Sequence, residues 1–191
     1  MKTKVISLLA IGLFLACNQP KQGPNMIVEG YEVYAVPNTN IQRVVKKHDT
    51  GKVIETGYLE AGKRHGLWIT FNERDGRITS MTSYINGLKD GPYLKFNNSE
   101  QIDLKANYEQ DELNGPYWEY QYGRILKEAN YDHGKLEGVY KEYYNNGKVL
   151  KEIEFSKGLQ NGYYRYYDEN GNVTVEYEYK DGEKISGGIK K

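Results

Sequence analysis

The chain has 191 residues, enough for one domain of ordinary size, and its 26 basic residues balance 26 acidic ones. Because a neutral chain offers no basic surface to phosphates, this balance argues against electrostatic binding to nucleic acid or to an anionic membrane. Because of this charge balance we expect no nucleic-acid partner. The composition is also unusual in its 21 Gly, its 19 Tyr and its single Cys.

The first sixteen residues predict a secretory signal. A short positive stretch, MKTK, precedes the apolar run 5–16, which is too short to cross a bilayer as a helix. The run ends directly before Cys17, and LFLAC resembles the lipobox of bacterial lipoproteins, in which the cysteine is acylated. The resemblance implies a lipid on Cys17 and a protein anchored in the cell envelope, at the outer membrane if the source has two membranes. The alternative is a secreted protein that is cleaved nearby and keeps an unpaired thiol.

Two short segments separate this signal from the rest of the chain. Residues 17–27 are polar with two Pro and predict a flexible tether. Residues 28–48 contain YEVYAV and IQRVV on either side of PNTN. They predict an irregular hairpin that caps the first end of the following domain.

The remainder, residues 49–191, repeats about every 24 residues. Its marker is a Gly in front of an aromatic strand, as in HGLWITF, DGPYLKF and NGYYRYY. These marker glycines are Gly66, Gly91, Gly115, Gly138 and Gly162. In most units a second Gly lies four residues before the marker and a first Gly lies fifteen before it. The third unit has Glu100 and Asp111 in place of these two, so we expect its turns to be less ideal.

Apolar and polar side chains alternate inside each unit, which is the pattern of a half-buried strand. Counted from the first Gly, the second, sixth and eighth positions are apolar or small and predict one buried face. In the second strand of the unit, Leu67, Ile69 and Phe71 follow the same rule and predict core. Dipeptides such as Asn146-Gly147 provide the positive φ angles that tight hairpin turns require.

Each unit is therefore predicted to be a β-hairpin. One hairpin buries too little apolar surface to fold alone, so successive hairpins must pair edge to edge. The predicted fold class is all-β: an elongated antiparallel meander of repeated β-hairpins in a single-layer sheet, after an N-terminal signal segment.

The pattern in NGKVLKEIEFSKGLQNGYYRYY resembles the bacterial variant of the MORN repeat, and the resemblance covers residues 49–191. It implies a β-hairpin repeat fold and a binding role, and it brings no catalytic residues. Proteins of this kind are often identified as YwqK-type antitoxins. The resemblance therefore also implies an alternative function, the neutralisation of a partner toxin.

A row of rings is the candidate binding site. It occupies the second position after each marker Gly: Trp68, Tyr93, Tyr117, Tyr140 and Tyr164. Alternation places the row on the face away from Leu67, among polar residues such as Glu119 and Glu142. A partner protein or a sugar can stack on such rings. The interpretation that we favour is that the rings form cross-strand ladders that shield a thin sheet, and the two roles can coexist.

The remaining polar residues show no catalytic constellation. His48, His65 and His133 occupy different repeat positions near turns, so we expect neither a metal site nor an acid–base site. Residues 168–172 lack the distal Glu of a calcium loop and predict a hairpin turn. The acidic residues of the late units predict pairs with Lys and Arg on neighbouring strands, with a stripe for a basic partner as the alternative. We expect no cofactor, no metal and no enzymatic activity; the expected partner is a protein, with a glycan as the alternative ligand.

Overall fold

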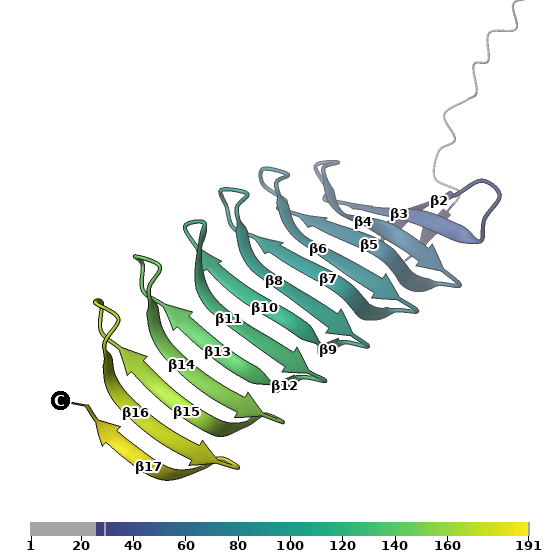
Figure 1. Cartoon of the computed structure of the whole chain (residues 1–191). Coiled ribbons are helices and arrows are strands. Elements are labelled where there is room, and N and C mark those ends of the chain that lie inside the picture. The colour runs from purple at the N-terminus through teal and green to yellow at the C-terminus, as the bar shows by residue number, and fades with distance from the viewer. Residues whose placement is uncertain (1–25, 29, 191) are drawn as a thin grey trace, which may run out of the picture.

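A computed structural model describes residues 26–28 and 30–190, which form one antiparallel sheet of 17 strands (Figure 1). The strands are β1 (Met26–Val28), β2 (Tyr31–Ala35), β3 (Ile41–Lys47), β4 (Val53–Glu60), β5 (Lys63–Phe71), β6 (Ile78–Ile85), β7 (Leu88–Phe96), β8 (Ile102–Glu109), β9 (Glu112–Leu113), β10 (Gly115–Gln121), β11 (Arg124–Asp132), β12 (Lys135–Leu136), β13 (Gly138–Tyr143), β14 (Val149–Ser156), β15 (Leu159–Tyr167), β16 (Val173–Lys180) and β17 (Glu183–Ile189). Within these described residues no helix is long and apolar enough to span a membrane.

The strands pair in chain order, except that β10 pairs with β8 and β13 pairs with β11, so the sheet is an open meander. β8 pairs with both β9 and β10, which are two parts of one strand interrupted at Asn114, and β11 pairs in the same way with β12 and β13. The predicted all-β meander of hairpins is confirmed. The expected signal 1–16 and Cys17 lie outside the described residues, whereas Met26 and Ile27, at the end of the expected tether, belong to β1.

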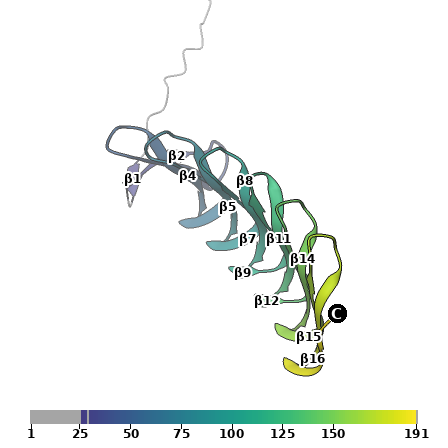
Figure 2. The ribbon, with the colours of Figure 1, turned by 90° about the vertical axis from the view of Figure 1, so that its left-hand side faces the viewer.

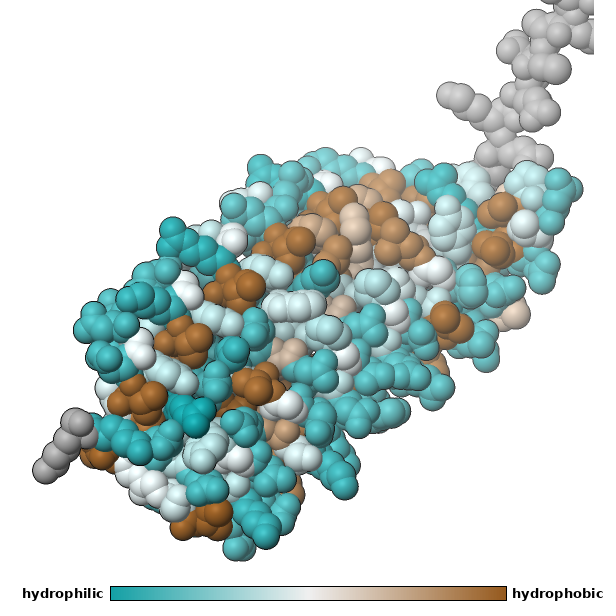
Figure 3. All heavy atoms as spheres, viewed as in Figure 1, coloured by the Kyte–Doolittle hydropathy of each residue, from teal (hydrophilic) through white to brown (hydrophobic). Residues whose placement is uncertain are grey.

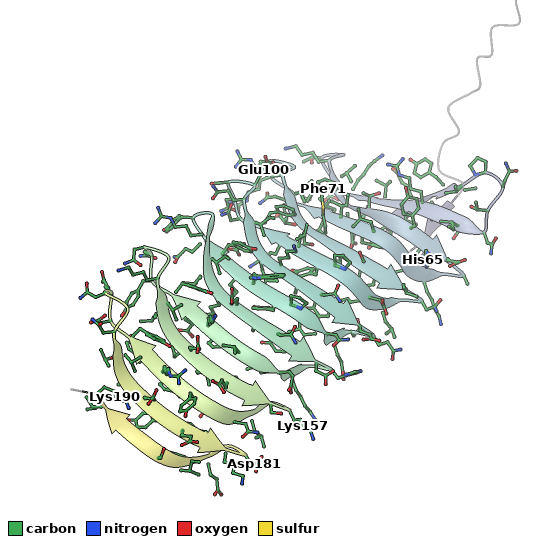
Figure 4. All side chains as sticks on the ribbon, viewed as in Figure 1. His65, Phe71, Glu100, Lys157, Asp181 and Lys190 are labelled. Carbon is green, nitrogen blue, oxygen red and sulfur yellow. The ribbon has the colours of Figure 1, made fainter. Side chains whose placement is uncertain are left out.

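Neighbouring hairpins are joined at their tips by a regular backbone bond. The N–H of the second Gly of a unit donates to a carbonyl of the preceding unit, as Gly87 does to Arg64 at 2.8 Å and Gly158 does to Leu136 at 2.9 Å. Asp111 makes the same bond, to Lys89 at 2.9 Å, with a φ of 70°. Its carboxylate also accepts the Lys89 N–H at 2.7 Å, a second bond that a glycine cannot provide. Lys157 and Asp181 lie at this tip edge, and Glu100 lies at the other edge (Figure 4).

The marker glycines bend the sheet. Gly66 and Gly162 have φ angles of 64° and 117°, which are unfavourable for residues that carry a Cβ atom. The β4–β5 pairing skips a register at this point, between Thr56 and Tyr58, as the later hairpins do at the corresponding place. Seen from the side, the short strands β9 and β12 turn away from the plane of β11 and β14 (Figure 2).

A β-bulge near the other edge corrects one sequence prediction. The register shifts between Thr70 and Phe71, so that Phe71 pairs with Ile78 and the intervening Thr79 is unpaired. Ile78, at the second position of its unit, therefore lies with Phe71 on the face away from Trp68, and not with the sixth and eighth positions as predicted. The same shift recurs in the β7–β8, β10–β11, β13–β14 and β15–β16 pairs.

The core follows the face of the sheet that carries the predicted row of rings, which we call the ring face. Its buried members along the repeats are Trp68, Thr82, Ala106, Ala129 and Ile153. The prediction of a core on the other face is wrong for Leu67, which is 45% exposed. The reason is register: β5 and β6 pair Trp68 with the small Thr82, so the sixth position shares a face with the rings.

The N-terminal hairpin completes this core. β2 and β3 pair with each other, and β3 pairs with β4 in a register that sets Val44 opposite Gly57. Val33, Val44 and Trp68 form one buried cluster, with Tyr31 and Tyr84 packed against it. The best-packed part of the described sheet is therefore its N-terminal end.

Candidate functional site

Rings and small residues alternate in one row across the ring face. Strand pairing sets Tyr93 beside Thr82 and Ala106, Tyr117 beside Ala129, and Tyr140 beside Ile153. Because strands lie about 4.8 Å apart, successive rings of the row stand roughly 10 Å apart. The rings of the row therefore do not stack on one another.

Each ring of the row pairs instead with a ring on the following strand. Four of the five pairs meet edge to face, with centroids 5.5–6.4 Å apart, a favourable arrangement for aromatic side chains. The pairs are Trp68–Tyr84, Tyr93–Tyr108, Tyr117–Tyr131, Tyr140–Phe155 and the tilted Tyr164–Tyr177. Cross-strand ring pairs thus cover the sheet, as the favoured interpretation predicts.

Trp68 belongs to the core and not to an accessible surface. It is 3% exposed, its ring lies against Gly57, and Tyr31 and Tyr84 meet it edge to face. The Arg64 guanidinium covers its ring, 4.0 Å from the centroid. Of the five candidate residues only the four tyrosines, all half-buried, remain on the accessible part of the ring face.

The hydroxyl groups of the row point to neighbouring carboxylates. Tyr117 donates to Glu119 at 2.8 Å and Tyr140 donates to Glu142 at 2.5 Å. Burial, followed by these hydrogen bonds, raises the pKa of Tyr117 and Tyr140 above the usual range of a phenol. The phenols are therefore fixed, protonated donors at neutral pH.

The charged residues of the sheet are paired across strands. On the ring face Lys127 lies 3.0 Å from Glu119, and Lys151 lies 2.8 Å from Glu142. Burial raises the pKa of Glu142, but hydrogen bonds from Lys151 and Tyr140 outweigh it and hold the net pKa below its ordinary value. The predicted pairing of the late acidic residues with Lys and Arg is confirmed on the other face, where Arg165 lies 2.8 Å from Glu176.

The face opposite the rings changes character along the sheet. One row, followed through the strand pairs from β5 to β16, runs through Ile69, Met81, Leu94, Lys105, Trp118, Glu128, Lys141, Glu152, Arg165 and Glu176. It begins apolar and ends as a ladder of alternating charge. Figure 3 shows apolar groups gathered over the earlier strands in its view, and isolated among polar groups over the later strands.

A basic residue after the first Gly holds neighbouring turns together, a role that the sequence pattern alone did not suggest. Lys148 Nζ donates to the Glu169 carbonyl, 21 residues later, at 2.8 Å. Lys52, Arg77 and Arg124 make the equivalent bond to the next turn. The recurrence of Gly-Lys or Gly-Arg at one repeat position was the available signal.

The three histidines lie apart: His65 is in β5, whereas His48 and His133 lie at two different turns. His65 lies 3.3 Å from Glu60, and His133 lies 2.6 Å from Asp132. The Asp168 carboxylate accepts the N–H groups of Asn170 and Asn172, which is the capping bond of a hairpin turn. Among the described residues no three His, Cys, Asp or Glu side chains are grouped to hold a metal ion.

Comparison with known proteins identifies part of the repeat. Residues 136–157 and 160–181 match the MORN repeat variant family. No curated protein matches the chain. Among solved structures, the chain is similar to a mutant of S. aureus TarM in complex with fondaparinux, alpha-GlcNAc-glycerol and UDP, with 9% identity over 83% of this chain and 22% of that chain, at a TM-score of 0.29.

It is also similar to a GtfA/B complex, with 13% identity over 56% of this chain and 19% of that chain, at a TM-score of 0.29. The chain thus spans about a fifth of the length of each of these two proteins. The chain is a β-hairpin repeat protein that carries MORN-variant units at residues 136–157 and 160–181.

Proposed function

We propose that this protein is a non-enzymatic, lipid-anchored protein of the bacterial cell envelope that acts as a protein-binding scaffold. The observation that carries the proposal is the regular ring face, where four tyrosines stand half-exposed at a fixed spacing on a single-layer sheet. Tyrosine offers a large, rigid contact area at a small entropic cost, and it is enriched in binding surfaces.

The charge states of the ring face favour binding over chemistry. Its phenols are held protonated as donors, and Glu142 is held ionised between Lys151 and Tyr140. A general acid or base needs a pKa near the working pH, whereas these shifts move the groups away from neutrality. The partner is therefore expected to meet a preorganised surface of rings and paired charges.

The anchor rests on Cys17, directly after the apolar run 5–16. Metabolic labelling with a palmitate analogue tests it. Label should appear on the wild-type protein and be lost in Cys17→Ser, whereas a control substitution in the tether, Asn18→Gln, should keep it. Label that persists on Cys17→Ser contradicts the anchor.

The scaffold role is tested by photo-crosslinking in cells at two tyrosines of nearly equal exposure. Tyr166 lies on the ring face and is 38% exposed, and Tyr163 lies on the other face and is 39% exposed. A photoreactive residue at position 166 should capture one defined protein, which mass spectrometry identifies, and position 163 should not capture it. Capture of no protein from the ring face contradicts the proposal.

An antitoxin or immunity-like role is the second candidate, favoured by the resemblance of the repeat units. Co-expression with the product of the adjacent gene tests it. Rescue from toxicity is expected if the ring face blocks a toxin, and no rescue counts against this role.

A glycan is the third candidate ligand, since the four accessible tyrosines could stack on sugar rings. A glycan array and envelope polysaccharides test this role. Binding that disappears in the Tyr117→Ala/Tyr140→Ala double variant is expected, and silence on the array removes the candidate.

A further inference from the structure

The turn between β10 and β11 differs from the other turns at its edge of the sheet. The marker Gly115 precedes the next first Gly, Gly123, by eight residues, whereas the corresponding distance is nine or ten in the other units. The turn consists of Tyr122 and Gly123, with φ angles of 51° and 74°. Two positive φ angles define a two-residue hairpin turn in which Asn or Asp ordinarily takes the first position.

A tyrosine at this position strains the backbone and exposes its ring. Bulky side chains disfavour a positive φ, and such outliers gather at functional sites. Tyr122 is also 83% exposed, the largest exposure among the exposed large hydrophobic residues. Neither folding nor packing explains a ring at a position that Asn would fill with less strain.

A hollow of about 310 Å³ lies between this turn and the next one, residues 144–148. Its volume is at the lower end of the range for ligand sites in proteins. The side chains that line it include Tyr122, Arg124, Ile125, Leu126, Tyr143 and Tyr144, together with the amides of Gln121 and Asn145. Aliphatic side chains, phenols, amides and one guanidinium thus surround a single recess.

Hydrogen bonds hold residues that line the hollow in place. The Tyr144 hydroxyl donates to the Tyr167 carbonyl at 2.7 Å, and the Arg124 guanidinium donates to the Asn145 carbonyl. Burial, and then a hydrogen bond to Glu128, raises the pKa of Tyr143, which stays a neutral donor. A recess fixed in this way loses little entropy when it is occupied.

We propose that this hollow binds an extended segment of a partner protein, taking one apolar side chain of that segment and pairing Arg124 with an adjacent carboxylate. Tyrosine and arginine around a recess are typical of binding hot spots. Arg124 is the only charged side chain among the described residues that line the hollow, so a carboxylate is the complementary group. The inference rests on the proposed protein-binding function and adds a location and a partner chemistry to it.

The test selects random linear peptides displayed on phage against the full-length chain. The enriched peptides should share an apolar residue beside Asp or Glu. The affinity of one such synthetic peptide is then measured by fluorescence anisotropy. Tyr122→Asn should weaken binding by about tenfold or more, although it relieves the strained turn and keeps the fold. Arg124→Gln should also weaken binding.

Two controls separate the ring from its surroundings. Tyr122→Phe keeps the ring and should bind the peptide nearly as well as the wild type. Ile189→Ala removes another highly exposed side chain, 80% exposed and outside the hollow, and should leave binding unchanged.

Failure of the hollow and failure of the scaffold role are distinguishable. The proposed peptide site is contradicted if the selected peptides bind Tyr122→Asn as tightly as the wild type. It is also contradicted if glycans, and no peptides, occupy the hollow. If the ring-face crosslink at position 166 still captures a protein, the scaffold role stands without the hollow. If it captures none, the scaffold role is contradicted as well.

Discussion

At the residue scale, the fit between Gly57 and Trp68 supports the core at the N-terminal end. A Cβ atom on residue 57 would lie 2.6 Å from Trp68 Cγ and closer still to two other ring atoms. Trp68 pairs on its other side with Thr82, so only the neighbour on β4 is as small as glycine. The absence of a side chain at Gly57 therefore lets the Trp68 ring lie against β4.

Gly57→Ala should lower the free energy of unfolding by about 1–3 kcal/mol, because the added methyl group overpacks a rigid core. Urea unfolding followed by tryptophan fluorescence measures the loss. Gly188→Ala is the matched control, since a Cβ at Gly188 meets nothing within 4 Å. Equal midpoints for the two variants would contradict the fit.

The tyrosines predict a loss of stability at alkaline pH. Burial, followed by a hydrogen bond to Glu55, raises the pKa of Tyr31 from 10.0 to about 12. The unfolded chain therefore releases this proton before the folded chain does. The stabilisation is complete below pH 10 and is lost as the pH rises toward 12. Tyr117 and Tyr140 are shifted in the same direction.

Urea midpoints measured across the alkaline range, with tyrosinate absorbance recorded in parallel, check this expectation. The midpoint should be flat up to about pH 9 and fall above pH 10. Tyr31→Phe should fall less steeply, because it lacks one of the shifted groups. A midpoint that is constant up to pH 12 would show that these hydroxyls are not protected in the folded state.

The rings also show what could not be predicted from single residues. Their positions and their pairing across strands follow from the repeat. The burial of Trp68 does not follow from the repeat, because it depends on Gly57 and on Tyr31, and Tyr31 lies outside the repeats. The prediction of the face on which Ile78 lies was wrong, because the bulge at Thr79 does not alter the alternation of apolar residues in the sequence.

At the scale of the element, the third unit shows how a turn tolerates a lost glycine. Glu100 takes the place of a first Gly and adopts a φ of 59°, close to the positive φ angles of Gly51 and Gly76. Its N–H still donates to the Asn97 carbonyl, at 3.0 Å. The turn therefore keeps its shape and carries the strain, as the repeat pattern predicted.

Glu100→Gly should raise the free energy of unfolding by about 0.5–1 kcal/mol. The relief of a left-handed conformation outweighs the greater entropy of glycine in the unfolded chain. Glu100→Ala is the control, because it removes the same carboxylate without relieving the backbone. Thermal unfolding of the two variants compares them, and equal gains would assign the effect to charge and not to φ.

At the scale of the whole molecule, each hairpin of the repeat contacts its two neighbours in sequence. The hydrogen-bonded tips, the basic residues between turns and the charge ladders all join adjacent hairpins. This linear arrangement follows from the 24-residue period, which is why the sheet was predictable. The bend at the marker glycines could not be predicted, because the period of a sequence repeat does not specify the curvature of the sheet.

The linear arrangement also explains why the ring face carries both the core residues and the exposed tyrosines. A sheet with one layer buries its rings only by cross-strand pairs and by its own bend, so the ring face stays partly open along its length. The proposed scaffold role requires such a surface, with a partner lying along it, and the hollow beside the turn at Tyr122 is the recess that the further proposal uses.

Deletion of one complete unit, residues 134–157, tests this arrangement most directly. The shortened chain should fold and unfold cooperatively in urea, with an m-value lower by roughly a seventh, because the m-value follows the surface exposed on unfolding. Deletion of half a unit, residues 134–145, should abolish folding. It removes β12 and β13 and joins β11 directly to β14, and these two strands run in the same direction in the sheet, so a tight turn cannot pair them. An unfolded product from the complete deletion, or a folded one from the half deletion, would contradict a stack of equivalent hairpins.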